Sequence, residues 1–138
     1  MAGYKVGYFV GSLATKSINR LLAQALVRLA PSELQMTEIS FRDLPLYSYD
    51  YDASYPPVAT EFKNAIAAID AVLFVTPECN RSIPGGLKNA IEWASRPYGQ
   101  NALHENRLPA LARSQARLEP RSRNNTCGAF CRSAIHHR

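Results

Sequence analysis

Residues 11 to 19 combine one glycine with hydroxyl, amide and ammonium groups, between an apolar run and an amphipathic run. Backbone N–H groups at such a glycine and at the start of a following helix suit an anion, because a helix N-terminus carries partial positive charge. The side chains that can donate hydrogen bonds to phosphate oxygens are those of Ser12, Thr15, Ser17 and Asn19. Lys16 adds a positive charge. The segment predicts a phosphate cradle, although Ser17 would also cap a helix without any ligand.

Two familiar phosphate-binding patterns do not fit this segment. A Walker loop needs a second glycine directly before its Lys-Ser pair, and Thr15 occupies that position. The dinucleotide pattern G-x-G-x-x-G needs two further glycines after Gly11, which the segment lacks. A cradle built mainly from hydroxyl groups is the remaining interpretation.

A second polar segment, residues 76 to 86, follows another apolar run and contains two prolines and two glycines. Turn and capping chemistry explains Pro84 and Gly85 as parts of a rigid connection. It explains Asn80 and Ser82 less well. Placed beside the phosphate cradle, this segment would provide an edge for a planar cofactor.

Three alternations of strand and helix position the two segments. We expect strands at residues 4–10, 34–40 and 71–75, helices at 18–29, 59–69 and 87–96, and a Pro-, Tyr- and Asp-rich loop at 43–57. This alternation predicts an α/β fold with a parallel sheet, right-handed crossovers and helices on both faces. Ligands of such sheets bind at the carboxyl ends of the strands, where both polar segments fall.

Composition indicates one globular domain. The chain has 138 residues, no apolar run reaches the ~18 residues of a membrane span, and three cysteines are too few for a disulfide framework. We therefore expect a cytoplasmic protein without a membrane partner. The net charge of +5 comes entirely from the C-terminal part: residues 1 to 102 hold nine basic and nine acidic residues, and residues 103 to 138 hold seven and two.

Longer stretches resemble the NADPH-dependent FMN reductase family, whose closest members are chromate and quinone reductases. The stretches are Gly11-Ser12-Leu13 with Ser17-Ile18-Asn19, Leu44-Pro45-Leu46-Tyr47, and residues 76 to 93, TPECNRSIPGGLKNAIEW. The resemblance covers about residues 4 to 102. It implies a flavodoxin-like, doubly wound parallel sheet, FMN at the strand ends and NAD(P)H as electron donor. It also implies quinones, chromate, azo compounds or free flavin as small-molecule acceptors, and a homodimer or homotetramer.

The resemblance also assigns residues to the cofactor. The residues that would bind the FMN phosphate are Ser12, Ser17, Ile18 and Asn19. Those that would line the isoalloxazine ring are Pro77, Glu78, Cys79, Asn80 and Ser82. No side chain needs to act as acid or base, because the flavin itself accepts and delivers hydride.

Two positions depart from the family pattern. Ala14 or Thr15 stands where the family usually has a basic residue, so phosphate affinity would rest on Lys16 and the helix dipole. Cys79 stands where the family usually has tyrosine, which weakens the expected packing beside the flavin.

The C-terminal part is the larger departure. Family members continue with a fourth strand, a glycine-rich flavin-contacting loop, a helix and a fifth strand. We expect the last two strands to be missing, so that residues 1–102 form an incomplete reductase domain and residues 103–138 a basic, disordered tail. The rival hypothesis is a catalytically inactive module whose tail binds acidic partners, without specific nucleic-acid recognition. The loosely spaced cysteines and histidines at 127–137 do not define a metal site.

The abrupt loss of pattern and the change in charge suggest a shifted reading frame near residue 104. Residues 121 to 138 can be encoded by codons that, in another frame, spell Ala-Ile-Ala-Gln-Gln-His-Leu-Arg-Arg-Val-Leu-Ser-Phe-Cys-Asn-Ser-Pro-Gln, which resembles the missing helix and strand. Sequencing the gene tests this hypothesis. A gene with no restored homology downstream in either alternative frame would refute it.

Overall fold

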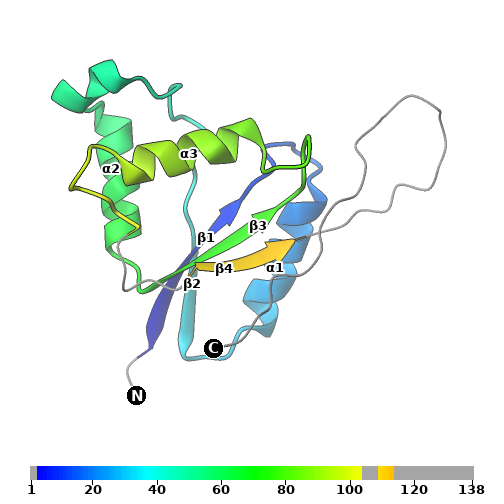
Figure 1. Cartoon of the computed structure of the whole chain (residues 1–138). Coiled ribbons are helices and arrows are strands. Elements are labelled where there is room, and N and C mark those ends of the chain that lie inside the picture. Colours follow the sequence, from blue (N-terminus) through cyan, green and yellow to red (C-terminus); the bar gives the residue numbers. More distant parts are fainter. Residues whose placement is uncertain (1–2, 104–108, 114–138) are drawn as a thin grey trace, which may run out of the picture.

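The computed structural model describes residues 3–103 and 109–113 as an α/β fold (Figure 1). The strands are β1 Tyr4–Val10, β2 Leu34–Glu38, β3 Ala71–Thr76 and β4 Pro109–Arg113, and all of their pairings are parallel. The helices are α1 Ile18–Leu29, α2 Pro57–Ala67 and α3 Gly85–Ser95, with a short 3-10 helix, η1, at Tyr49–Ala53. The strand order β2-β1-β3-β4 is the start of the flavodoxin-like order. The predicted fold class is confirmed.

The three α-helices and the first three strands lie within two residues of their predicted bounds. Ser17 is the N-cap of α1, and its Oγ accepts a hydrogen bond from the Arg20 backbone N–H at 3.3 Å. Pro57 opens α2, where the missing N–H of proline costs nothing. The predicted loop at 43–57 contains η1, which the sequence pattern did not indicate.

The expectation that the last two strands are missing is wrong for the fourth strand. β4 pairs with β3 from Val72–Pro109 to Thr76–Arg113, so β3 lies inside the sheet. The segment Pro-Ala-Leu-Ala-Arg contains no β-branched or aromatic residue, and strand propensity therefore gave no signal. Without β4, one edge of β3 would carry unpaired backbone N–H and C=O groups, and these groups offer a template for this segment. The rest of the predicted tail, residues 104–108 and 114–138, lies outside the described residues.

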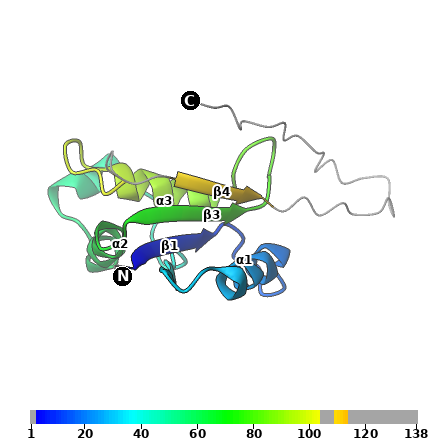
Figure 2. The same ribbon diagram turned by 90° about the horizontal axis from the view of Figure 1, so that it is seen from below.

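Helices cover both faces of the sheet, as predicted (Figure 2). On one face, Val10 and Val75 pack with Ala23 of α1. On the other face, Phe9 stacks on Phe74 with ring centroids 5.1 Å apart and belongs to the larger core with α2 and α3. Because successive side chains of a strand point to opposite faces, one short strand supplies both cores.

The loop at residues 43–55 is clamped onto α3. Trp93 is fully buried, and its Nε1 donates to the Pro45 carbonyl oxygen at 2.8 Å. Asn89 Nδ2 donates to the same oxygen at 2.9 Å, and Asn89 Oδ1 accepts from the Tyr47 backbone N–H at 2.8 Å. The rings packed around Trp93 are those of Tyr47, Tyr51 and Tyr55. This clamp fixes the path of the chain from β2 to α2.

Tyr55 gives the clamp a predicted pH dependence. Its Oη is buried without a hydrogen-bond partner among the described residues, and burial, with the nearby Asp52 carboxylate, raises the pKa of Tyr55 to about 12. An unfolded tyrosine ionises near pH 10, so the contribution of the neutral phenol to stability is lost between about pH 10 and 12. Tyr55→Phe should therefore leave stability near pH 7 little changed and flatten its alkaline decline, measured by urea unfolding from pH 8 to 12.

The matched control is Tyr49→Phe, because the Tyr49 side chain is 75% exposed. Equal pH profiles for the two variants would contradict the assignment to Tyr55.

Candidate functional site

The loops that follow β1 and β3 leave the sheet side by side at its carboxyl edge. Val10 and Val75 are register partners, and the Gly11 N–H donates to the Val75 carbonyl oxygen at 2.8 Å. A Cβ atom on Gly11 would lie 2.3 Å from Thr76 Oγ1, a contact that only glycine avoids. The two polar segments therefore meet at the edge where parallel sheets bind their ligands.

The first loop ends in a helix start that fits a phosphate group. Ser17 and Asn19 are only 6% and 5% exposed, which places two polar side chains inside the start of α1. The first turn of α1 contains no acidic residue, so nothing there opposes the partial positive charge of the helix N-terminus. Ser12 is half-buried at the start of the loop, and Lys16 is exposed. Ile18 is 52% exposed, and its contribution to a cradle would come from its backbone N–H.

The second loop contains a tight two-residue turn. Cys79 and Ser82 exchange two backbone N–H···O bonds, both 2.8 Å long, and Asn80 and Arg81 between them have φ of 50° and 61°. Positive φ at both central residues is the pattern of a type I′ turn. Asparagine tolerates this conformation well, whereas for arginine it costs about 1 kcal/mol. This turn is a regular element that the sequence pattern did not reveal.

The predicted ring-lining residues divide between the base and the tip of this turn. Pro77, Glu78 and the free thiol of Cys79 are half-buried at the base. Asn80 at the tip and Ser82, opposite Cys79 at the base, are exposed. The structure thus brings the five residues onto one loop beside Gly11, with a half-buried part and a part open to solvent.

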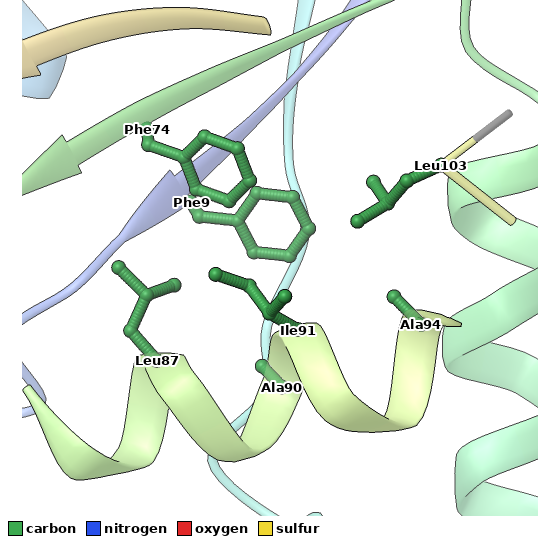
Figure 3. Close-up of a pocket in the computed structure, with 7 residues that line it drawn as sticks. All are labelled: Phe9, Phe74, Leu87, Ala90, Ile91, Ala94 and Leu103. Atoms are coloured by element: carbon green, nitrogen blue, oxygen red, sulfur yellow. The ribbon is translucent and has the colours of Figure 1, made fainter. Parts of the chain in front are cut away.

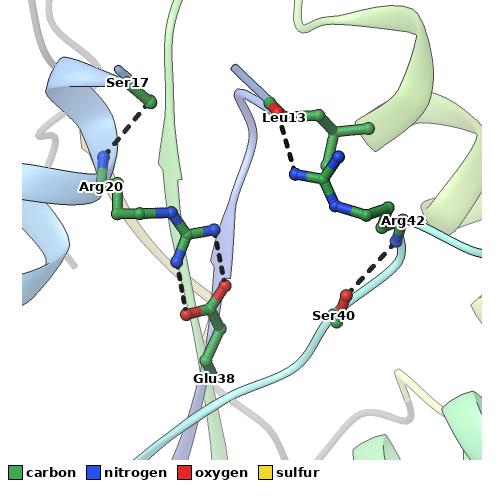
Figure 4. A network of polar contacts seen from close by, with 6 residues as sticks. All are labelled: Leu13, Ser17, Arg20, Glu38, Ser40 and Arg42. Atoms are coloured by element: carbon green, nitrogen blue, oxygen red, sulfur yellow. Dashed lines mark hydrogen bonds and ion pairs between the residues drawn. The ribbon is translucent and has the colours of Figure 1, made fainter. Parts of the chain in front are cut away.

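Two arginines that the sequence analysis did not assign lie beside the first loop (Figure 4). Arg20 of α1 holds both carboxylate oxygens of Glu38 at 2.8 and 2.9 Å. Arg42, from the loop after β2, donates through Nη2 to the Leu13 carbonyl oxygen at 2.9 Å. A usable signal existed, because Arg42 closely follows a predicted strand and all parallel strands end at one edge of the sheet.

Two other hollows do not suit a flavin phosphate. An apolar seam between the sheet and α3 has no free space large enough to hold a water molecule, so it is no ligand pocket (Figure 3). A second hollow, of about 270 Å³, lies between the end of β2 and α2. Asp43 and Glu61 line it, together with Glu38, whose carboxylate is paired with Arg20. Negative charge there disfavours an anion.

Comparison with known proteins decides the family. A family model described as NADPH-dependent FMN reductase matches residues 4–118, which is most of the chain. The chain belongs to the NADPH-dependent FMN reductase family. The match continues past residue 104, beyond the point where the apolar pattern of the sequence ends, and it includes β4.

Individual members of the family are closely similar over the same region. A 2-hydroxy-1,4-benzoquinone reductase from Burkholderia sp is 54% identical over 97 residues, covering 70% of this chain and 53% of that protein. A quinone reductase from Pseudomonas putida is 55% identical over 100 residues, covering 72% of this chain and 54% of the reductase. This chain therefore spans about half the length of these relatives.

A solved structure supports the same fold. FerB, a flavoenzyme NAD(P)H:(acceptor) oxidoreductase from Paracoccus denitrificans, has a TM-score of 0.75 and 42% sequence identity to this chain. The match covers 80% of this chain and 60% of FerB.

The described part of the chain lacks two kinds of feature. Within it, no helix has the length and apolar character needed to cross a bilayer. Residues 3–103 and 109–113 also bring together no group of three or more His, Cys, Asp or Glu side chains suited to a metal ion. The cysteines and histidines at 127–137 lie outside those residues.

The contact between the two loops yields a direct test. Gly11→Ala should destabilise the fold by about 1–3 kcal/mol, because the new methyl group would overlap the Thr76 side chain and force the loops apart. Urea unfolding measures this loss. Gly85→Ala is the matched control, since a Cβ on Gly85 would meet nothing within 4 Å. Equal stability changes in the two variants would show that the loops do not need the close approach.

Proposed function

We propose that this chain belongs to an NAD(P)H-dependent oxidoreductase that uses bound FMN to reduce small-molecule acceptors, quinones first among them. The observation that carries the proposal is the joined site at the carboxyl edge. There, the buried Ser17 and Asn19 begin a helix beside a tight turn, and Gly11 brings the two segments into contact. Quinones come first because the relatives from Burkholderia and Pseudomonas are named for them. Chromate, azo compounds and free flavin are further candidate acceptors.

In this proposal the chain binds and orients the flavin, and bound FMN supplies the hydride chemistry. Hydroxyl groups of Ser12 and Ser17, with backbone N–H groups at the start of α1, would donate to the phosphate oxygens. Pro77, Glu78 and Cys79 would form a wall beside the ring, and the exposed turn at Asn80 and Ser82 would cover its edge. Fixed turn geometry favours this role, because little ordering is needed on binding.

Assembly and location complete the proposal. The family resemblance implies a homodimer or homotetramer, and a cytoplasmic location fits a reductase that draws on NAD(P)H. These properties concern the whole protein and stay predictions, because the chain spans about half the length of its relatives.

Ser17→Asp tests the phosphate cradle while keeping the helix cap. Aspartate caps helices as well as serine, so the fold should be retained, but its carboxylate would repel the FMN phosphate. Losing a hydrogen bond to a charged group costs about 1.5–3 kcal/mol, so the Kd for FMN should rise at least about tenfold. Titration by quenching of flavin fluorescence measures it, and circular dichroism checks the fold.

Riboflavin, which lacks the phosphate, is the matched control ligand, and its affinity should change little in Ser17→Asp. An equal loss of affinity for FMN and riboflavin would mean that Ser17 does not face the phosphate. If the unchanged chain binds neither flavin, the rival hypothesis of a module without flavin gains support.

A further inference from the structure

The basic residues around the first loop differ in two respects: whether an acidic side chain neutralises their charge, and whether the side chain is held in place. Lys16 is the one basic residue between Gly11 and Asn19, and its side chain is exposed. Arg20 is engaged by both oxygens of Glu38 in a bidentate pair, which neutralises its charge locally. Neither residue is therefore an uncommitted, fixed positive charge beside the cradle.

Arg42 is exposed like Lys16, but a hydrogen bond holds its guanidinium group in place without neutralising its charge. Its Nη2 donates to a neutral group, the Leu13 carbonyl oxygen, at 2.9 Å. Within the described residues the ion pairs are Arg20–Glu38 and Lys88–Glu92, so the Arg42 charge is not neutralised there. A guanidinium group has five N–H donors, so one bond to Leu13 leaves others for a ligand.

The surroundings hold Arg42 in place at this loop. Its neighbour Phe41 is 5% exposed, and its ring packs on Phe9 with centroids 6.3 Å apart. A Cβ on Gly86 would lie 3.5 Å from the Phe41 ring and 3.7 Å from the Leu13 side chain. The start of α3 therefore lies against both Phe41 and Leu13. Arg42 thus follows the buried Phe41, at the place where the loops after β1 and β2 and the start of α3 meet.

The bond to Leu13 also orients the cradle itself. In a trans peptide the C=O and the following N–H point in opposite directions. Holding the Leu13 carbonyl toward Arg42 therefore turns the Ala14 N–H away from Arg42. The contact therefore fixes the orientation of the Leu13–Ala14 peptide, with the guanidinium group on its carbonyl side.

We propose that Arg42 is a positioning residue for a phosphate monoester: it fixes the first loop through Leu13 and supplies the positive charge that faces the FMN phosphate. This inference rests on the proposed binding of FMN. The NADPH 2′-phosphate offers the same chemistry. FMN is the source assigned here, because Arg42 contacts the loop that leads into α1.

The experiment compares Arg42→Gln, Arg42→Lys and Arg28→Gln by flavin fluorescence titration at low and high salt. Arg28 lies in the last turn of α1, at the end remote from the cradle, and its change alters net charge equally. Arg42→Gln should raise the Kd for FMN about tenfold or more at low salt and that for riboflavin less than twofold. Arg42→Lys should recover part of the affinity, since it keeps the charge and loses the planar fork. Arg28→Gln should match the unchanged chain.

Three results would overturn the proposal. They are an unchanged FMN affinity in Arg42→Gln, an equal loss for FMN and riboflavin, and an increase in the KM for NADPH alone. The last would assign Arg42 to the dinucleotide phosphate. If the unchanged chain itself fails to bind FMN, the proposed function fails, which is a different outcome from an unaffected Arg42→Gln variant.

Discussion

The close approach of Gly11 to Thr76 is the constraint on which the rest of the site depends. The N–H of Gly11 continues the ladder between β1 and β3 by one bond, to Val75, and no side chain can stand between the strand ends. Both loops must therefore start within contact of each other. One then turns into the capped start of α1, and the other into the turn at Cys79–Ser82. A larger residue at position 11 would separate the start of α1 from the turn at Cys79–Ser82.

A second set of contacts holds the surroundings of this edge. Trp93 and Asn89 bind the Pro45 carbonyl oxygen and so hold the loop after β2 against α3. The same loop carries Phe41 into the core and Arg42 to Leu13. Charge is separated accordingly: guanidinium groups lie beside the first loop, whereas Asp43 and Glu61 line the hollow against α2. An anion is favoured at the edge of the sheet and disfavoured beside α2.

Much of this arrangement follows from the sequence, and the failures have physical causes. Apolar periodicity located α1 and β3 because burial on one or both faces decides those elements. It missed β4, whose Pro-Ala-Leu-Ala-Arg sequence has no strand propensity and depends on the open side of β3. It missed the turn because Asn80-Arg81 lacks the glycine that usually marks positive φ. It missed Arg42 because the contact with Leu13 joins residues 29 positions apart.

The central claim is that the carboxyl edge of the sheet holds the phosphate of FMN. Phosphorus-31 NMR of the chain with one equivalent of FMN tests it most directly, because it observes that group alone. The second pKa of a phosphate monoester lies near 6, and cations and N–H donors around it favour the dianion. The account predicts a bound resonance displaced from that of free FMN, with little change between pH 7.5 and 5. A resonance from bound flavin that titrates like free FMN would place the phosphate in solvent and contradict the account.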